Sequence, residues 1–208
     1  MSRESLVSIV MNCHNGERYL KKSVCSIINQ TYRNWELIFW DNKSSDNSAK
    51  IIKSFKDKRI KYYYSKKKTV LYFARNLAIK KAKGEFIAFL DVDDFWDRKK
   101  LSLQIPKFKN RKIGLVYSNF YKYYNRNEKE IAYKNKLPSG KVTSSIIRNY
   151  HVGFLTGAMR KSFLKKTKLF DFNYDLISDY AFILNFSLKY KFIGIDKPLA
   201  SYRVHVDQ

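Results

Sequence analysis

The stretch 86-FIAFLDVDD-94 indicates a buried β-strand that ends in an acidic turn. Three carboxylates within four residues repel one another unless a cation or hydrogen bonds compensate. Side chains alternate in an extended segment, so we expect Asp91 and Asp93 to point the same way. Two carboxylates on one face suit Mg²⁺ or Mn²⁺, whose coordination shell is completed by waters and substrate phosphates. The alternative is a solvated turn in which Asp93 or Asp94 caps a following helix.

Acidic residues are scarce in the rest of the chain. The 208 residues include 42 Lys and Arg against 18 Asp and Glu, a net charge of +24. A cluster of acids in so basic a chain favours the metal site over the solvated turn. The charge itself should attract polyanions such as nucleic acid, anionic lipid or a phosphorylated substrate. The alternative origin of the charge is compositional drift toward Lys, Asn, Ile, Tyr and Phe.

The overall composition is that of a globular protein. Hydrophobic residues make up 45% of the chain and charged residues 29%, and this length can bury a core without a structural metal. Cys13 and Cys25 alone cannot build a disulfide framework or a thiolate zinc site, and they fit a reducing cytoplasm. No apolar run approaches the roughly 20 residues of a spanning helix. We therefore expect a cytoplasmic protein, with peripheral contact with the inner face of an anionic membrane as an open option.

The sequence before the acidic turn alternates between strand and helix patterns. Apolar runs of strand length occur at 6–11, 35–40, 60–64 and 85–90. Between these runs, apolar residues recur at helical spacing in three groups: Leu20, Val24, Ile27 and Ile28; Ile51, Ile52 and Phe55; and Leu71, Ala74, Leu77, Ala78 and Ala82. We expect Ser45 to cap the second of these helices and Gly84 to end the third. This alternation predicts an α/β fold with a mostly parallel central sheet and helices on both faces.

Three polar segments follow strands of this predicted sheet, at 12–16, 41–46 and 91–94. Parallel sheets bind ligands at the carboxyl ends of their strands, so we expect all three segments at one edge. The segment at 41–46 has an alternative interpretation as an Asx-turn before a helix. Arg75, inside a helical pattern, is either a solvated cation or a contact for a phosphate or base.

The second half of the chain has a less regular pattern. We expect a strand at 113–119, a Tyr- and Lys-rich stretch at 121–136 and a turn at 138–140. Helices follow at 144–150 and 178–189, with a strand at 191–196 between the second helix and a tail at 198–205. With no linker and no internal repeat, the chain reads as one domain whose second half builds the far wall of the site.

The chain resembles the family 2 glycosyltransferases, which have the GT-A nucleotide-sugar-binding fold. The resemblance rests on 7-VSIVMNCHNGERYLKKSVCSIINQTYRNWELIFWDNKSSDNS-48 and 74-ARNLAIKKAKGEFIAFLDVDDFW-96, with weaker matches at Ser178-Asp179 and 202-YRVH-205. It implies a single GT-A-like domain over residues 1–208. Residues 1–100 would form the Rossmann-like, nucleotide-sugar-binding half, and residues 101–208 the acceptor-binding and catalytic half.

The resemblance also implies roles for individual residues in donor binding. His14 stands where family members often stack an aromatic ring on the base. Asn42 replaces the second Asp of a frequent pair; because Asn both donates and accepts hydrogen bonds, it need not contact the same edge of uracil, and the base is not fixed. A UDP-sugar is weakly favoured as the donor. The implied donor-binding residues are Asn12, His14, Asn15, Asp41, Asn42, Arg75 and Asp91.

The implied metal and catalytic residues lie further along the chain. Asp91 and Asp93 match the family's metal-and-diphosphate motif, with Asp94 as a neighbouring candidate and Mn²⁺ or Mg²⁺ as the ion. His205 matches a histidine that completes the metal shell in some members; its alternative is a frayed surface position. Asp179, at the start of an apolar helix, matches the general base of inverting members; its alternative is a helix cap.

The implied function is transfer of a sugar from a nucleotide-diphosphate sugar to an acceptor hydroxyl with inversion, on a bacterial surface glycan or a lipid-linked saccharide. The alternative is a basic nucleic-acid-binding module without catalysis, supported by Tyr and Lys interleaving at 61–68 and 121–129. The sequence has no recognised nucleic-acid-binding motif, so we expect no specific nucleic acid partner. Nucleotidyl transfer would need a glycine-rich loop, and the seven glycines do not cluster.

Overall fold

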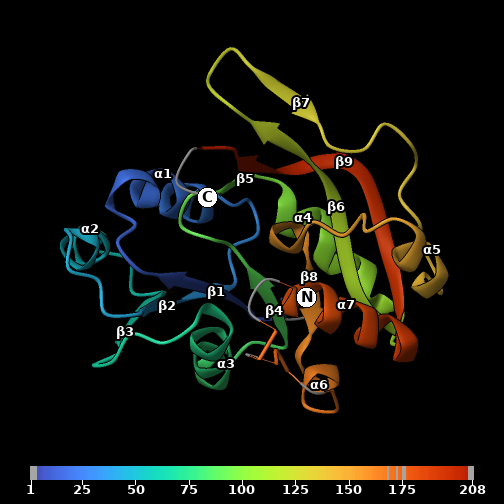
Figure 1. Cartoon of the computed structure of the whole chain (residues 1–208), viewed down its shortest axis with the longest axis horizontal. Helices are drawn as coiled ribbons and strands as arrows, with labels where there is room; N and C mark the ends of the chain where they lie inside the picture. Colours follow the sequence, from blue (N-terminus) through green and yellow to red (C-terminus); the bar gives the residue numbers. More distant parts are fainter. Residues whose placement is uncertain (1–3, 168, 172, 175–176, 206–208) are drawn as a thin grey trace.

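A computed structural model describes residues 4–167, 169–171, 173–174 and 177–205. Within them, the strands form one mixed sheet in the order β3-β2-β1-β4-β8-β6-β9-β5, with β7 paired to β6 outside this path (Figure 1). The strands are β1 (Val7–Cys13), β2 (Trp35–Asp41), β3 (Ile60–Tyr64), β4 (Phe86–Phe89), β5 (Phe95–Trp96), β6 (Ile113–Tyr123), β7 (Lys129–Ile131), β8 (Ala158–Arg160) and β9 (Lys191–Arg203).

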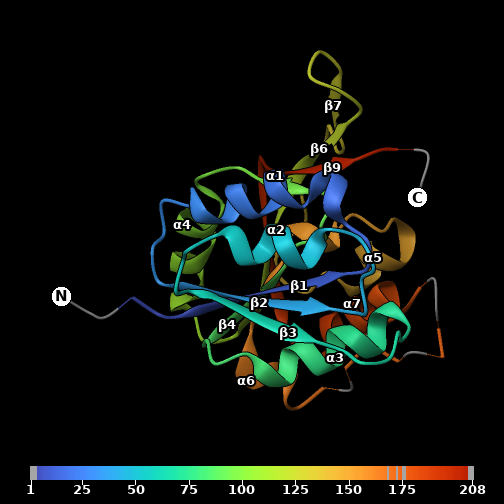
Figure 2. The same cartoon turned by 90° about the vertical axis from the view of Figure 1, so that its left-hand side faces the viewer.

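Helices cover both faces of this sheet, as the alternating pattern predicts (Figure 2). The first face carries α1 (Glu17–Ile28), α2 (Ser48–Ser54) and α4 (Lys100–Gln104), followed by the 3-10 helix η1 (Ile105–Lys109). The second carries α3 (Leu71–Lys81), α5 (Thr143–Arg148), α6 (Lys161–Leu164) and α7 (Ser178–Lys189), with the 3-10 helix η2 (Phe154–Thr156) nearby. Apolar side chains alternate along the strands, so each helical layer buries its own core against the sheet.

The carboxyl ends of β1, β2 and β4 meet at one edge of the sheet, which confirms the expected grouping of the three polar segments. Strands β3, β2, β1 and β4 are parallel, and Cys13 lies beside Asp41 in the β1–β2 register. The Asn42 N–H donates to the Cys13 carbonyl at 2.7 Å, and the Ser23 hydroxyl donates to the Asp91 carbonyl at 3.2 Å. The loop after β2 is therefore bonded to the end of β1, and the loop after β4 to α1.

Two predicted helix boundaries are wrong. Ser45 does not cap α2, which begins at Ser48; the Ser45 N–H donates to Asn15 Oδ1 at 2.8 Å. Gly84 is not the glycine of a helix C-terminus, because α3 ends at Lys81 with an extended cap residue. Gly84 is instead required by close packing: a Cβ there would lie 2.6 Å from the Leu6 carbonyl oxygen.

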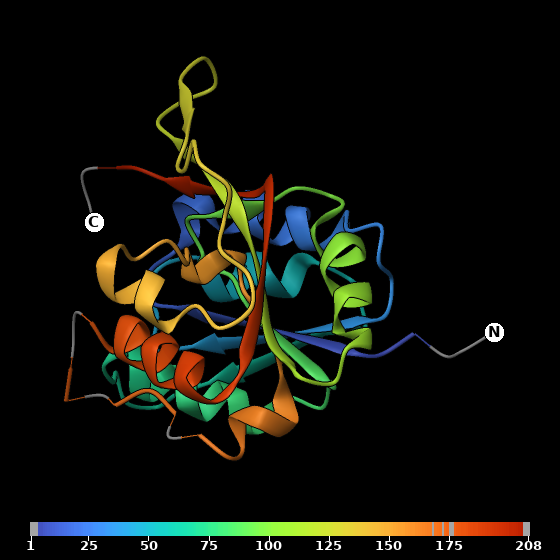
Figure 3. The ribbon, with the colours of Figure 1, turned by 90° about the vertical axis from the view of Figure 1, so that its right-hand side faces the viewer.

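The second half departs most from the sequence-based expectation. Strand β6 runs on to Tyr123, and β7 returns to it, so the Tyr- and Lys-rich stretch forms a hairpin that projects from the body (Figures 1, 2 and 3). Strand β9 absorbs most of the expected tail, since it continues to Arg203 alongside β6. The helices predicted at 144–150 and 178–189 are confirmed, as α5 and α7. None of the helices in the described ranges has the length and apolarity to cross a bilayer.

Candidate active site

Asp41 and Asn42 close β2 and shape the loops around it. The Asp41 side chain is fully buried; its Oδ1 accepts the Ser44 N–H at 2.7 Å and its Oδ2 accepts the Tyr62 hydroxyl at 2.8 Å. Burial and this hydrogen bond raise the pKa of Tyr62. The Asn42 amide donates to the Thr69 carbonyl at 2.7 Å and accepts the Thr69 N–H at 3.1 Å. Asp41 therefore ties β2 to β3 and to its own following loop, and Asn42 fixes the segment at Thr69.

The end of β1 and the loop after it leave polar groups available at the same edge. Asn12 is 7% exposed, and within the described part of the chain neither atom of its side-chain amide has a hydrogen-bond partner. The His14 ring is exposed, with Nδ1 3.1 Å from the Asn42 carbonyl oxygen. Asn15 adopts a positive φ of 55°, and its Oδ1 accepts the Ser45 N–H. A buried amide without a partner is costly unless a ligand satisfies it.

Arg75 and Asp91 form an ion pair between α3 and the end of β4. The Arg75 Nη2–Asp91 Oδ1 distance is 2.7 Å, and the Arg75 side chain is only 4% exposed. The rings of Phe154 and Tyr72 lie 4.8 Å and 5.5 Å from the guanidinium carbon. The solvated-cation interpretation of Arg75 is therefore wrong: this cation is held in an aromatic surrounding against one carboxylate of the acidic turn.

The acidic segment 91–94 is a turn, closed by a 3.2 Å hydrogen bond from the Asp94 N–H to the Asp91 carbonyl. The alternation expected for an extended segment does not apply, and the carboxylates of Asp91 and Asp93 have different partners, Arg75 and His205. Strand β5 follows the turn directly, so neither Asp93 nor Asp94 caps a helix.

The C-terminal strand packs against this turn. Asp94 is 2% exposed and its Oδ1 accepts the Arg203 N–H at 2.8 Å, while Arg203 Nε donates to the Asp93 carbonyl at 2.8 Å. Burial, together with the charges of Asp93 and Asp91, raises the pKa of the Asp94 carboxyl well above its usual range. His205 is thereby held with Nε2 3.0 Å from Asp93 Oδ2 and 13% of its side chain exposed. It does not fray.

The acidic turn and His205 bring together side chains of the types that can bind a metal ion. Within the described ranges, no group of three or more His, Cys, Asp or Glu side chains is arranged to hold a metal ion. Asp93 and His205 lie in contact, and Asp91 is bonded to Arg75. Mg²⁺ is commonly held by one or two carboxylates together with waters and substrate phosphates. The protein groups therefore fit a divalent ion whose shell a phosphorylated ligand completes.

Asp179 faces the acidic turn across a pocket. The pocket has a volume of about 310 Å³, and three carboxylates line it: Asp91, Asp94 and Asp179. Asp179 lies in the first turn of α7, whose N-cap is Ile177; its Oδ1 accepts its neighbour's N–H at 2.8 Å and the Tyr72 hydroxyl at 3.4 Å. Residues 175–176 of the motif around Asp179 lie outside the described residues. The remaining lining residues are Phe120, Lys122, Tyr133, Tyr150, Val152, Gly153, Phe154, Leu155 and Tyr202.

The aromatic lining of this pocket was missed by sequence reasoning. Tyr150 has a buried hydroxyl group with no hydrogen-bond partner in the described ranges, and burial and nearby Asp179 raise its pKa. The Tyr133 hydroxyl donates to the Tyr150 carbonyl at 3.0 Å. No spacing signal unites these residues, because they come from separate loops and strands.

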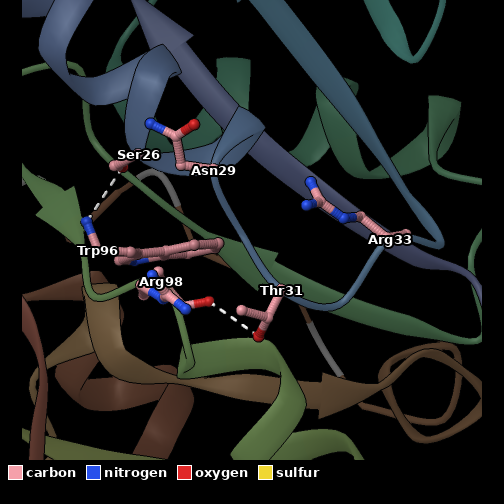
Figure 4. Close-up of a pocket in the computed structure, with 6 residues that line it drawn as sticks. All are labelled: Ser26, Asn29, Thr31, Arg33, Trp96 and Arg98. Atoms are coloured by element: carbon pink, nitrogen blue, oxygen red, sulfur yellow. Dashed lines mark hydrogen bonds between the residues drawn. The ribbon is translucent and has the colours of Figure 1, made fainter.

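A larger pocket, of about 540 Å³, lies away from the carboxylates (Figure 4). It is lined by Ser26, Asn29, Thr31, Arg33, Trp96 and Arg98, near the C-terminal end of α1. The backbone N–H of Trp96 donates to Ser26 Oγ, and the Thr31 hydroxyl donates to the Arg98 carbonyl. Figure 4 shows the Trp96 ring lying between Ser26 and Arg98. It contains no acid or base suited to group transfer, so volume alone does not mark the candidate active site.

Sequence comparison relates the chain to known proteins. Residues 8–183 match the description Glycosyl transferase family 2. UDP-Glc:alpha-D-GlcNAc-diphosphoundecaprenol beta-1,3-glucosyltransferase WfgD of Escherichia coli is 38% identical over 159 residues, which cover 76% of this chain and 62% of that protein. The Escherichia coli enzyme WfaP, described with the same activity, is 42% identical over 119 residues, covering 56% of this chain and 46% of that protein. The chain thus spans less than two thirds of the length of either relative.

Structural comparison gives the same fold. S. aureus TarS 1-349 in complex with UDP superposes with a TM-score of 0.81 at 21% identity, covering 95% of this chain and 60% of that one. The mannosyltransferase PcManGT from Pyrobaculum calidifontis, in complex with GDP-Man and Mn²⁺, superposes with a TM-score of 0.73 at 15% identity, covering 99% of this chain and 59% of that one. The expected GT-A-like fold is confirmed.

Proposed function

The chain belongs to glycosyl transferase family 2, and from this premise we propose that it transfers a sugar from a nucleotide-diphosphate sugar to an acceptor hydroxyl with inversion. The observation that carries the proposal is the shared pocket of Asp91, Asp94 and Asp179. Asp91 comes from the edge where the strands of a parallel sheet end, and Asp179 comes from the opposite wall. A donor and an acceptor can meet between them.

The donor would bind along the edge formed by the loops after β1, β2 and β4. The unpartnered Asn12 amide and the exposed His14 ring suit contacts with a nucleoside, and loops fixed by Asp41 and Asn42 would receive it with little reorganisation. A UDP-sugar is supported by the names of the Escherichia coli relatives and by the UDP complex of TarS. Arg75, held by Asp91, would lie near the phosphates.

We propose Mn²⁺ or Mg²⁺ as the cofactor. PcManGT, of the same fold, was solved with GDP-Man and Mn²⁺. In this chain Asp93 and His205 would hold the ion, with Asp91 beside them. The bound ion would supply charge neutralisation for the diphosphate leaving group.

Asp179 is the proposed general base. Its carboxylate would accept the proton of the acceptor hydroxyl as the acceptor oxygen bonds to the anomeric carbon and the bond from that carbon to the phosphate oxygen breaks. Attack from the face opposite the leaving group inverts the configuration. The Tyr72 hydroxyl, 3.4 Å from Asp179 Oδ1, would orient the carboxylate.

The acceptor would occupy the aromatic part of the pocket. Phe120, Tyr133, Tyr150 and Tyr202 offer ring faces and hydroxyl groups of the kind that contact sugars. A lipid-linked saccharide of a bacterial surface glycan is supported by the diphosphoundecaprenol named for the relatives. The net charge of +24 also suits peripheral contact with an anionic membrane.

A thermal-shift panel of nucleotide diphosphates and their sugars, each with and without Mn²⁺, tests this proposal. We expect a rise in Tm for one base, larger when Mn²⁺ is present, and loss of the metal-dependent part in Asp93→Ala. Glu128→Ala, which removes an exposed hairpin carboxylate, is the matched control and should behave like the native chain. A flat panel from folded protein would contradict the proposal and favour the nucleic-acid-binding alternative.

A further inference from the structure

Helices α5 and α7 lie side by side on the second face of the sheet (Figure 3, amber and orange-red). The Ser187 hydroxyl donates to Thr143 Oγ1 at 3.0 Å, and the rings of Tyr150 and Tyr180 lie 5.0 Å apart. The start of α5 thus lies beside the end of α7, and the residues just after α5 lie beside the start of α7, so the two helices run antiparallel. The solvent-exposed residues of these two adjacent helices form their outer surface.

Large aliphatic side chains are exposed on this surface. Leu188 is 68% exposed, Ile147 is 62% exposed and Ile177 is 56% exposed. Ile177, the N-cap of α7, and Ala181, Leu184 and Leu188 recur at spacings of four, three and four residues, which places them along one stripe. Ala181 and Leu184 are half-buried, and Leu184 packs against the core, so the exposed part of the stripe is its two ends. Ile147, one turn beyond Thr143, flanks this stripe from α5. Among the described residues, only Tyr64 and Tyr174 are other large apolar or aromatic side chains more than half exposed.

Basic side chains border the stripe at the C-terminal end of α7. A pocket of about 350 Å³ there is lined by five cations and no carboxylate: Arg111, Lys112, Lys141, Lys189 and Lys191. Arg148 adds an exposed cation on α5. We call the exposed Ile147, Ile177 and Leu188, together with these six cations, the α5–α7 surface.

We propose that the α5–α7 surface docks the protein onto an anionic lipid bilayer. Exposed aliphatic side chains on a helix lower their free energy by entering the interfacial region of a bilayer, and flanking Lys and Arg are attracted to acidic headgroups. Single-stranded nucleic acid fits the surface less well, because bases bind by stacking on aromatic rings, whereas the exposed side chains here are Ile and Leu. The combination of aliphatic stripe and cation cluster selects lipid as the partner.

The position of this surface connects it to the active site. Helix α7 begins at Ser178, so Ile177 directly precedes the segment that carries Asp179 into the pocket. A protein docked through α7 would hold the mouth of the pocket close to the membrane, where the sugar of a lipid-linked acceptor lies. This consequence rests on the proposed function; the docking itself does not.

Co-sedimentation with vesicles tests the docking. The full chain is mixed, without donor or acceptor, with phosphatidylcholine vesicles that contain or lack phosphatidylglycerol. Binding should require the anionic lipid and should weaken at least about tenfold in the variant K141Q/K189Q/K191Q. The matched control is K50Q/K56Q/K58Q, which removes the same charge from exposed positions on and after α2, across the molecule. It should bind nearly as the native chain does.

A second pair of variants tests the aliphatic stripe. I147Q/L188Q should weaken vesicle binding severalfold at the same salt concentration, whereas Y64Q, at an exposed residue of the edge strand β3, should not. Equal losses for the two lysine triples, or no loss for I147Q/L188Q, would overturn the proposal. The proposal would also be overturned if light scattering showed that the native chain is a dimer and the I147Q/L188Q variant a monomer. A second copy of the chain would then cover the surface. Because no nucleotide sugar is present, these outcomes are independent of whether the chain transfers sugar.

Discussion

The loop after β2, next to the pocket-lining Asp91 in the proposed donor wall, and the proposed acceptor wall around Asp179 differ in how their polar groups are satisfied. On the donor side, Asp41 and Asn42 direct all their side-chain oxygen and nitrogen atoms to strand β3 and to neighbouring loops, at distances of 2.7 to 3.1 Å. On the acceptor side, Asp179 has one side-chain partner, at 3.4 Å, and the buried Tyr150 hydroxyl has none in the described ranges. The loop after β2 is thus held in place by its own hydrogen bonds, whereas Asn12 on the donor side and Tyr150 on the acceptor side keep polar groups for a ligand.

The topology accounts for this difference. Adjacent parallel strands deliver the donor-side loops to one edge, where short side chains can bond from loop to loop. The acceptor wall is assembled from α7, the end of β9 and the segment before η2, which are neighbours only in space. Changes on the acceptor wall should therefore affect turnover, and changes on the donor wall should affect donor affinity and stability.

The largest expected effect comes from Asp179→Asn. The amide keeps the shape of the carboxylate but cannot take the acceptor proton, so turnover should fall by about 10²- to 10⁴-fold. Donor affinity, measured by calorimetry, should stay within about twofold of the native value, because the donor wall is unchanged. Equal losses in turnover and donor affinity would show that the two walls are not separable.

The next largest effect is expected for Arg75→Met. Removing the guanidinium leaves Asp91 without its cation, and we expect a loss of about 2–3 kcal/mol in the free energy of unfolding. The loss should be below that of a fully buried pair, because 39% of the Asp91 side chain is exposed. Urea denaturation gives the value. Arg33→Met, at an exposed arginine, is the control, and an equal loss there would refute the role of the ion pair.

Asn42→Ala tests the preorganisation of the donor wall. It removes the hydrogen bonds that hold Thr69, and we expect about 1–3 kcal/mol of destabilisation together with weaker donor binding. Thermal unfolding and donor calorimetry on the same variant measure both effects. Asn127→Ala, in the exposed hairpin, should change neither. Destabilisation without any loss of donor affinity would mean that the loop does not shape the donor site.

The smallest effect concerns Lys100, which lies in α4 outside both walls. This lysine is completely buried; its Nζ donates to Gln104 Oε1 at 2.8 Å, and Gln104 in turn donates to the Thr156 carbonyl. Burial lowers the pKa of Lys100 well below its usual value of 10.5. At pH values between the lowered pKa and 10.5, the Lys100 amine is protonated in the unfolded chain but not in the folded chain. The free energy of unfolding therefore rises with pH until about pH 10.5.

Lys100→Met should therefore flatten the rise in stability between pH 7 and pH 10, and raise stability at pH 7 by roughly 1 kcal/mol. Urea midpoints across that range provide the measurement, with Lys99→Met, next to it and exposed, as the control. A pH slope that is identical in the native chain and Lys100→Met would refute the assignment. Turnover should be unaffected, because Lys100 does not line the pocket.

The donor wall was the more predictable of the two. Continuous apolar runs and helical spacing in the first hundred residues predicted the four parallel strands and their helices, and the polar segments after the strands met at one edge. The errors there have local causes. The turn at 91–94 gave Asp91 and Asp93 separate partners, and close packing against β1 explains Gly84.

The acceptor wall was predictable only in part. The apolar pattern identified α7 and hence Asp179, but Tyr133, Tyr150 and Tyr202 reach the pocket through a long β6–β9 pairing and through loops that carry no periodic signal. The burial of Asp94, and its bond to the backbone of Arg203, also depend on a pairing distant in sequence. Contacts of this kind are set by tertiary packing rather than by local propensity.

The stereochemistry of transfer tests the central claim most directly. Proton NMR would follow an α-linked nucleotide sugar, selected by the thermal-shift panel, as the native chain transfers it to an acceptor or, slowly, to water. A single displacement across the pocket between Asp91 and Asp179 predicts a product that first appears in the β configuration, with this signal lost in Asp179→Asn. A product that first appears in the α configuration would contradict the account.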